Sequence, residues 1–370
     1  MLFRSANGTL QLDHKQNLTY DNTSTYRSYL TMASGSTLIL NYTDTQSYVD
    51  LILQGATVEL LQTQTWYGNV TLSGTNTFNV ATDKTWTTSS GSWTNASGQT
   101  GAITKTGSGT LVLGNSTSTW TGLTTLSAGT LRTATNNAFG TSAGGVLVNG
   151  GVLDVRHTLA DDITLNGGTL YGYGGSISST ITLSQNSTIE AGSTTTISGV
   201  ITDGDNSYSL TKTGTGMLDL TGSSGNTYDG GTNINAGYIR LQNSDNNLGT
   251  GAVVVASGAG LDIYNRSISN NITIEGALSA TAGALYNSTG TATFSGSVTM
   301  AAAASIGGSG TLTVSGVIDD GGNGYTLSKI GTGVVILSAV NTYTGDTEVD
   351  RKSTRLNSSH VRTSRMPSSA

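Results

Sequence analysis

Residues 210–240 read LTKTGTGMLDLTGSSGNTYDGGTNINAGYIR, and this stretch decides the fold because it occurs three times. The other copies are ITKTGSGTLVLGNSTSTWTGLTTLSAGTLR at 103–132 and LSKIGTGVVILSAVNTYTGDTEV at 327–349. The copies share an apolar-x-Lys-x-Gly-x-Gly-x-apolar-x-Leu frame, and then an aromatic residue, Gly, Thr and an apolar strand. The shared lysines are Lys105, Lys212 and Lys329, which recur at similar intervals along the chain. Such self-similarity is typical of repeat architectures.

The sequence around the copies repeats as well. TTTISGVITDGDNSYSLTKTGTG (194–216) aligns without gaps on TLTVSGVIDDGGNGYTLSKIGTG (311–333), and 15 of 23 positions are identical. GGVLDVRHTLADDITLNGG (150–168) is echoed by GAGLDIYNRSISNNITIEG (258–276). These flanking repeats extend the repetitive region to about 101–349.

Between these landmarks lie strands of three or four residues, such as TLVL, VLDV, VVV and ITI, separated by Gly, Asn, Asp or Ser turns. Strands this short gain little stability as independent hairpins. They can stack as turns of a solenoid, in which each turn covers the apolar face of its neighbour. We therefore expect an all-β fold, a parallel β-helix over roughly residues 20–349. With ~20 residues per turn, it would have about 17 turns, which would lie ~4.8 Å apart.

The composition excludes other classes. Thr (64), Gly (51), Ser (46) and Asn (28) make up about half of the 370 residues, and only 10% are charged. A helical protein needs far more Ala, Leu, Glu and Lys. The absence of Cys excludes disulfide frameworks and Cys-ligated metal sites. No apolar run approaches the ~18 residues of a membrane-spanning helix. The formal net charge of −6 offers no electrostatic footprint for nucleic acid.

The Lys-x-Gly-x-Gly strand and the Gly-x-[Leu/Ile]-Arg ending resemble the passenger-associated transport repeat, or autotransporter-associated β-strand repeat, of bacterial type V secreted proteins. The ending matches at Arg132 and Arg240, whereas Ile330 replaces the usual Thr in the third copy. The resemblance implies a right-handed β-helix exported through its own outer-membrane β-barrel translocator, and a location at the cell surface or outer membrane or in the medium. Residues 6–100 match poorly and are assigned to divergent turns from composition and strand pattern.

The two ends differ from the rest of the chain. Residues 350–370 contain five of the 16 basic residues and the single Pro, and DRKSTRLNSSH within them looks like a translated short-read sequencing adapter. Leu-Phe-Arg-Ser at 2–5 resembles the same adapter in reverse complement. We therefore expect 1–5 and 350–370 not to be native, so that the signal sequence and the barrel would lie beyond these junctions. The alternative is a basic extension that binds an acidic partner.

Some β-helices are polysaccharide lyases or hydrolases, so the paired carboxylates are candidates for acid–base chemistry. The pairs Asp161–Asp162 and Asp319–Asp320 are adjacent, and strand alternation would send their side chains to opposite faces. We expect turn or surface positions for both. The segment Asp203–Asn206 lacks the later bidentate acid of a calcium loop, so we expect a solvated turn there as well.

Other candidate residues also have a structural interpretation. His14 and His157 are the histidines outside the tail, and we expect no nucleophile marked by a Gly-Asp-Ser-Gly or Gly-x-Ser-x-Gly string. We expect the three shared lysines to be structural rather than anion-binding. The shared aromatic position could pack over a turn or form a carbohydrate platform; its residues are Trp120, Tyr228 and Tyr343. The sequence thus predicts no catalytic residue, no cofactor-binding residue and no metal ligand.

Two functions remain open. The first is a structural and adhesive surface segment, whose repeats support export and turn-by-turn folding and whose partners include host or neighbouring-cell ligands or glycans. We expect no intrinsic enzymatic activity in that case. The second is a β-helical polysaccharide-active enzyme, which would need a cluster of carboxylates on adjacent turns with Lys or Arg nearby.

Overall fold

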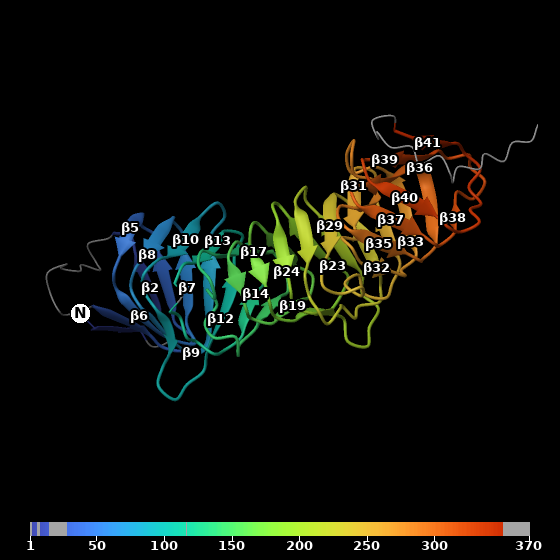
Figure 1. Ribbon diagram of the computed structural model, residues 1–370. Helices are drawn as coiled ribbons and strands as arrows, with labels where there is room; N and C mark the ends of the chain where they lie inside the picture. The colour runs from blue at the N-terminus through green and yellow to red at the C-terminus, as the bar shows by residue number, and fades with distance from the viewer. Residues whose placement is uncertain (1, 6–7, 15–27, 116, 351–370) are drawn as a thin grey trace, which may run out of the picture.

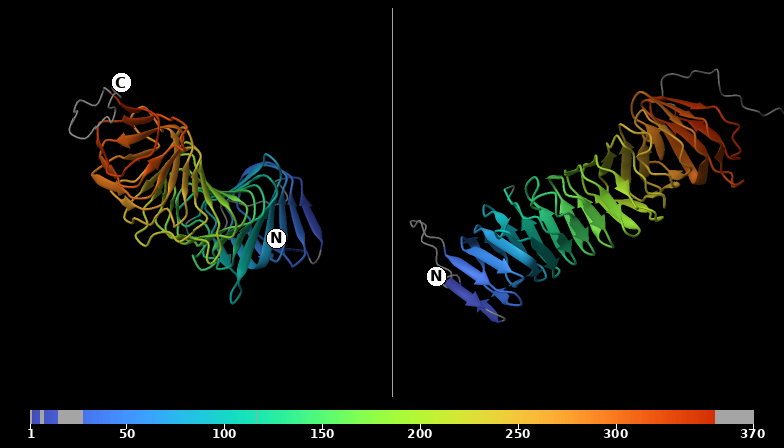
Figure 2. Two further views of the ribbon diagram at one scale, coloured as in Figure 1. Left: turned by 90° about the vertical axis from the view of Figure 1, so that its right-hand side faces the viewer. Right: turned by 90° about the horizontal axis from the view of Figure 1, so that it is seen from below.

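The computed structural model describes residues 2–5, 8–14, 28–115 and 117–350. These residues form strands and turns without any helix, and the strands stack in a parallel β-solenoid of about 15 turns. Within the same ranges no helix could span a membrane. The molecule is a long, bent rod whose described ends lie far apart (Figures 1 and 2). The expected all-β parallel β-helix is confirmed.

Each turn of the solenoid has three faces, which we number in chain order. The first face contains β1 (Leu2–Ser5), β3 (Tyr29–Met32), β6 (Asp50–Gln54), the first part of β9 (Val70–Val80), β11 (Trp93–Asn95), β18 (Thr158–Leu159), β21 (Ser176–Ile177), β24 (Thr195–Ile197), β27 (Met217–Leu220), β29 (Gly237–Leu241), β31 (Ala259–Asp262), β34 (Leu285–Asn287), the second part of β36 (Val298–Gly308), β39 (Leu327–Ile330) and β41 (Thr347–Val349).

The second face contains β2 (Thr9–Leu12), β4 (Thr37–Leu40), β7 (Thr57–Leu60), the second part of β9, β12 (Gly101–Thr106), β14 (Thr124–Leu126), β16 (Val146–Val148), β19 (Ile163–Leu165), β22 (Ile181–Leu183), β25 (Ile201–Thr202), β32 (Ser267–Ile268), β35 (Thr291–Phe294), β37 (Thr311–Val314) and β40 (Val334–Leu337). The third face contains β5 (Asp44–Ser47), β8 (Gln64–Trp66), β10 (Thr85–Thr88), β13 (Thr110–Leu113), β15 (Thr130–Thr133), β17 (Val152–Val155), β20 (Thr169–Gly172), β23 (Ser187–Ala191), β26 (Leu210–Thr213), β28 (Thr232–Ile234), β30 (Val253–Val255), β33 (Ile272–Gly276), the first part of β36 and β38 (Ile318–Asp319).

Strand pairing joins each turn to the next. Every pairing between strands of the described residues is parallel, and the isolated bridge between Ala277 and Gly283 is antiparallel. The number of residues per turn varies. Thr77 pairs with Thr104 and Leu147 pairs with Thr164, and the turn between the first pair is much longer than the turn between the second. Since several turns are longer than the length assumed from the sequence, the solenoid has fewer turns than expected.

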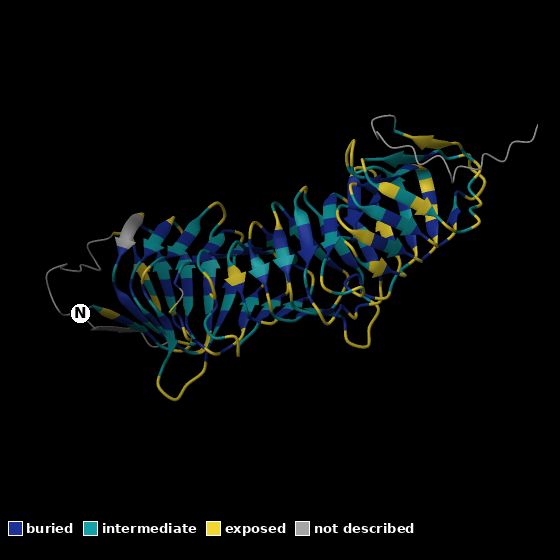
Figure 3. Ribbon diagram, viewed as in Figure 1, coloured by how far each residue is buried: buried dark blue, intermediate teal, exposed yellow. Residues whose placement is uncertain are grey.

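Alternation along the short strands builds the core. In β4, β7 and β37 every second residue is buried and the residues between are half-buried. Inward Leu, Ile and Val therefore form one continuous apolar column along the rod (Figure 3), as β-branched, pleated strands favour. Near the N-terminal end this column is aromatic, because all four Trp are fully buried there: Trp66, Trp86, Trp93 and Trp120. Neighbouring rings have centroids 5.9–6.4 Å apart.

The three sequence repeats do not lie on one face. Lys105 lies in β12 on the second face, Lys212 in β26 on the third and Lys329 in β39 on the first. On the second face, pairing runs from β12, the strand of Lys105, through β14, β16, β19 and β22 to β25. The next strand in the chain, β26, lies on the third face. Successive repeats are therefore rotated about the rod by one face out of three. Identical surface features of the repeats consequently point in different directions.

Some sequence predictions concern residues outside this description. The expected adapter-derived tail at 350–370 lies outside the described residues from 351 onward, so its origin stays a prediction. The same holds for the adapter origin of 1–5, although β1 pairs with β3. On the last complete turn, Val334 and Ile336 of β40 are exposed, as are Val340 and Val349.

Candidate functional site

The shared lysine of the first two repeats points inward and ties together backbone carbonyls. Lys105 Nζ donates to the carbonyl oxygens of Thr106 (2.6 Å), Gly107 (2.8 Å) and, one turn later, Ala128 (3.2 Å). The second repeat has the same arrangement, in which Lys212 Nζ donates to Thr213, Gly214 and Ala236 at 2.7–2.9 Å. Each lysine therefore closes its own turn and links it to the following one.

The glycines of the repeat frame follow from the same geometry. Gly107 has a φ of +68°, a conformation that L side chains rarely adopt. Gly129 of the following turn lies directly over this corner, where an added Cβ would be 2.8 Å from Lys105 Nζ and 2.3 Å from the Gly107 oxygen. Gly237 lies equally close over Gly214 and Gly216. The Lys-x-Gly-x-Gly strand and the later Gly-x-[Leu/Ile]-Arg strand are thus two halves of one stacked corner.

This environment excludes the lysines as surface anion sites. Lys105 and Lys212 are fully buried, and burial lowers the pKa of each to about 8. Their donors are already used by carbonyl oxygens. Lys329 repeats the theme more weakly, because among the described residues its Nζ donates only to Gly331 (2.5 Å). The expected structural role matches the geometry.

The shared aromatic position is also internal. Trp120 and Tyr228 are fully buried, and Tyr228 OH hydrogen-bonds with Thr232 Oγ1 at 2.7 Å. In the third repeat, Tyr343 OH makes the same bond with Oγ1 of Thr347, which again lies four residues after the aromatic residue. Burial raises the pKa of Tyr228 far above its ordinary value. A carbohydrate platform at Trp120 or Tyr228 is therefore ruled out, and the packing interpretation holds.

The polar chemistry of the repeats lies on the outer surface, where the last Arg of a repeat meets an Asp of the next turn. In the first repeat, Arg132 Nε lies 2.6 Å from Asp154 Oδ2. Arg156 Nε contacts both oxygens of the same carboxylate, at 3.0 and 3.1 Å. Asp154 is buried beneath the two guanidinium groups, whose side chains are 34% and 36% exposed. Arg156 also lies over the ring of Tyr173.

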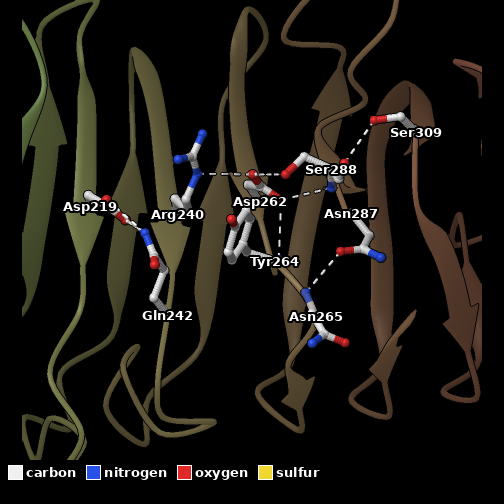
Figure 4. Close-up of polar contacts among 9 residues, drawn as sticks. All are labelled: Asp219, Arg240, Gln242, Asp262, Tyr264, Asn265, Asn287, Ser288 and Ser309. Atoms are coloured by element: carbon white, nitrogen blue, oxygen red, sulfur yellow. Dashed lines mark hydrogen bonds and ion pairs between the residues drawn. The ribbon is translucent and has the colours of Figure 1, made fainter. Parts of the chain in front are cut away.

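The second repeat builds a related ladder with different neighbours (Figure 4). Arg240 Nε lies 3.4 Å from Asp262 Oδ2, and Ser288 Oγ donates to the same oxygen at 2.7 Å. Asp262 Oδ1 accepts backbone N–H bonds from Tyr264 and Ser288. On the preceding turn, Asp219 accepts both of its bonds from the Gln242 side chain, at 2.9 Å each.

These carboxylates are poorly suited to acid–base catalysis. Asp262 is fully buried and its two oxygens accept four hydrogen bonds, so no proton-transfer position is left open. Asp219 and Asp262 lie on opposite sides of Arg240 along the ladder, because both pair in register with it. Burial raises the pKa of Asp219, but Gln242 already holds that carboxylate. The geometry is that of a structural ion-pair ladder.

The adjacent acid pairs of the sequence are separated as expected. Asp161 is buried, and this burial raises its pKa to about 7, whereas its exposed neighbour Asp162 accepts the Thr180 N–H. In the other pair, Asp320 is the buried member. Burial alone would raise its pKa, but N–H donors of Thr344, Tyr325 and Gly322 lower it to about 2.

The segment at 203–206 is the sister turn of the one that begins at Asp320. Asp203 Oδ2 accepts the Tyr208 N–H, just as Asp320 Oδ2 accepts that of Tyr325, both at 2.9 Å. Both aspartates are buried, so the solvated turn expected from the sequence is wrong in this detail. No group of three His, Asp or Glu that could hold a metal ion exists within the part of the chain that the structure describes.

His157 belongs to the solenoid wall. Its Nδ1 lies 3.2 Å from the carbonyl oxygen of Thr133 on the preceding turn. Sequence inspection overlooked one Gly-x-Ser-x-Gly string, GTSAG at 140–144. Its Ser142 is exposed between strands and not at the strand-to-helix turn that such a nucleophile requires. Among the described residues no hydrogen bond joins Ser142 to His157.

Sequence reasoning also missed the Arg–Asp ladder. A signal was present, because Arg132 precedes Asp154 by 22 residues and Arg240 precedes Asp262 by the same 22. Equal spacing at one turn's length places two residues side by side in a parallel solenoid. The pairing of opposite charges could have been inferred from that coincidence.

Comparison with protein families identifies the repeated unit. The model of the passenger-associated transport repeat matches residues 103–132, 210–241 and 327–351. The chain carries three passenger-associated transport repeats. These are the repeats expected at 103–132, 210–240 and 327–349. A comparison with curated proteins and another with solved structures each gave no match.

The repeats and the β-solenoid together support an autotransporter passenger domain. Repeats of this family imply a translocator domain in the full protein. They also imply surface exposure or secretion of the repeat-bearing segment.

Proposed function

We propose that this chain is a structural and adhesive segment of an autotransporter passenger, displayed by its own outer-membrane β-barrel at a bacterial surface. The observation that carries the proposal is the buried lysine of the first two repeats, Lys105 and Lys212. Lys212 Nζ bonds two carbonyls of its own turn and one of the following turn. The third bond forms only when the next turn has been laid down. Such a link favours ordered growth of the solenoid during export.

The distribution of the repeats supports this role. A solenoid turn contacts only its neighbours, so its stability is local and needs reinforcement at intervals along the rod. Lys105 and Lys212 supply charged internal links that are several turns apart. The rotation of the repeats about the axis places these two links on different faces. A ligand site shared by the repeats would instead gain from lying on one face.

Export can be tested on a bacterial surface. The chain is fused to an autotransporter barrel, and display is measured by antibody labelling of intact cells and by resistance to added protease. We expect the double variant Lys105→Met/Lys212→Met to reduce protease-resistant display severalfold. The matched control, Lys84→Met, changes a lysine outside the repeats. Equal display of both variants and the parent would contradict the export role.

Adhesion is tested with the same cells. Cells that display the chain should bind to host-cell or neighbouring bacterial layers more than cells that display the barrel alone.

The proposal of no intrinsic catalysis is tested on polysaccharide and peptide panels. Turnover that disappears on mutation of His157 or of a single acid would refute that part.

A further inference from the structure

The first repeat carries a pair of arginines whose outer donors are unused. Arg132 and Arg156 hold the buried Asp154 through Nε alone. In the hydrogen bonds made by the described residues, their terminal Nη groups have no protein partner. A guanidinium with its terminal N–H groups facing solvent is a fork that matches the two oxygens of a carboxylate. Two such forks lie on adjacent turns.

The local charge favours an anion. Arg132 and Arg156 carry two positive charges against the one negative charge of Asp154 between them, in a chain whose formal net charge is −6. Asp154 is shielded because both arginines cover it. The next acid along the ladder is Glu190, which pairs in register with Tyr171 one turn beyond it. The positive charge is therefore concentrated at the two arginines.

An aromatic surface continues this patch along the rod. Tyr173 is 50% exposed, and its ring lies beneath Arg156, with the guanidinium carbon 5.4 Å from the ring centroid. The ring of Tyr171 is nearly parallel to it, at 16° and with centroids 6.4 Å apart. A tyrosine ring offers an apolar face and a polar hydroxyl, the combination that packs against a sugar ring.

The three side chains lie on three successive turns. Arg132 is in β15, Arg156 directly follows β17 and Tyr173 directly follows β20. With ~4.8 Å between turns, the patch extends roughly 10 Å along the rod. A linear polymer lying parallel to the rod can contact all three at once. A single small anion can contact only part of the patch.

We propose that Arg132, Arg156 and Tyr173 form a binding site for a carboxylate-bearing polysaccharide. The arginines bind carboxylates of the chain, and Tyr173 packs against a sugar ring between or beside them. This inference rests on the proposed adhesive function and names its ligand class. The second repeat lacks the site, because its Arg240 lies between Asp219 and Asp262 and its equivalent of Arg156 is Tyr264.

The test measures binding of the full chain by titration calorimetry. The probes are polygalacturonate, its fully methyl-esterified form, dextran sulfate and neutral dextran. We expect polygalacturonate to bind, with a Kd that rises with salt, and the methyl ester and dextran to bind at least about tenfold more weakly. Dextran sulfate should bind more weakly than polygalacturonate. Equal binding of dextran sulfate or of the methyl ester would overturn the carboxylate assignment.

Variants of these three residues test whether the polysaccharide binds at this site. Arg132→Lys/Arg156→Lys keeps both charges but removes the forks, and Tyr173→Ala removes a half-exposed ring. Each should weaken polygalacturonate binding about fivefold or more. Tyr173→Ala should leave the melting temperature unchanged, whereas the double Lys variant also loses the Nε bonds to Asp154, so its folding is verified by circular dichroism. The matched control is Arg240→Lys, which perturbs the equivalent Arg–Asp pair in the second repeat and should bind as the parent does. Unchanged binding in both test variants, or equal loss in the control, would overturn the site.

Failure of this inference is distinguishable from failure of the proposed function. Displayed cells carrying Tyr173→Ala that still adhere fully, with no binding of polygalacturonate by the parent chain, would refute the site and leave adhesion standing. Cells displaying the parent that do not adhere to any surface would refute the adhesive function itself.

Discussion

The first and second passenger-associated transport repeats are nearly the same inside and different outside. Both contain a buried lysine bonded to three carbonyls and a buried aromatic residue near a Thr hydroxyl. On the outer surface, the first repeat has Val112 where the second has Asp219, and Ala134 where the second has Gln242. The first ladder also has Arg156 where the second has Tyr264, so it carries a net positive charge, whereas Asp219 gives the second ladder a net negative charge.

This difference separates the requirements of the fold from those of the surface. Inward residues must complete a partly buried corner whose backbone carbonyls accept bonds from the lysine, so lysine and glycine are needed in both copies. Outward residues need only be compatible with a strand, so they are free to differ. Because the repeats also point in different directions, each presents its own chemistry to its own surroundings. Ligand specificity, on this view, belongs to individual repeats rather than to the array.

The largest effect is expected from breaking what the repeats share. Lys105→Met and Lys212→Met each remove a cation and leave three part-buried carbonyl oxygens without that donor, which costs about 2–4 kcal/mol of local stability. Lys329→Met should cost about 1 kcal/mol, because this lysine bonds a single carbonyl. Amide hydrogen exchange in the strands around each lysine measures the local free energy of unfolding. Equal losses at all three positions would show that the bond to the next turn contributes nothing.

The sequence predicts the solenoid and the interior of its repeats well. Short β-branched strands, turn glycines and three copies of one frame indicate a parallel solenoid, and the structure confirms it. The buried state of Lys105 is consistent with its place in an apolar, strand-like motif. Trp120 and Tyr228 share a repeat position with little chemical similarity beyond an aromatic ring, which favours packing.

The contacts between outward-facing residues could not be derived in the same way. Which outward residues meet depends on register, and register depends on turn length, which is much shorter between Leu147 and Thr164 than between Thr77 and Thr104. The sequence separation of successive repeats therefore does not by itself reveal their rotation by one face. The burial of Asp203 was missed for a related reason, because its partner Asp229 lies on the following turn.

A second prediction concerns a buried acid that only the first repeat's flank carries. Burial raises the pKa of Asp161 to about 7 from an ordinary 3.8, and Oδ1 has no hydrogen-bond partner. The folded state therefore holds the proton more tightly than the unfolded chain. Stability from this group is complete below about pH 4 and is lost as the pH rises through 7. At the aligned position the second repeat's flank has the neutral Ser269.

The variant Asp161→Asn tests this difference directly. It should melt like the parent at pH 4 and be more stable by about 2 kcal/mol at pH 8, because the parent must then hold an ionised carboxylate in a buried position. Thermal unfolding followed by circular dichroism at both pH values measures it. The control, Asp162→Asn, alters the exposed neighbour and should not produce this pH dependence. A parent stability that rises between pH 4 and pH 7 through Asp161 would contradict the sign.

The smallest effect is expected from exchanging the outer residues between repeats. Asp219→Val places the first repeat's residue in the second and removes a buried carboxylate with a raised pKa, but it leaves Gln242 without its acceptor. The two effects oppose each other, so the net gain at pH 7 should not exceed about 1 kcal/mol. Urea unfolding measures it, and the gain should shrink as the pH falls, because the raised pKa of Asp219 favours the protonated carboxyl.

The reciprocal exchange decides whether the outer residues act as a pair. Val112→Asp alone should destabilise the first repeat by about 1 kcal/mol, because the new carboxylate lacks the amide that holds Asp219. Adding Ala134→Gln supplies that amide one turn later and should recover at least half of the loss. The double-mutant cycle gives the coupling energy of the two side chains. A coupling near zero would mean that Asp219 and Gln242 are independent surface residues, and the charge difference between the repeats would then reflect separate substitutions rather than an exchangeable surface unit.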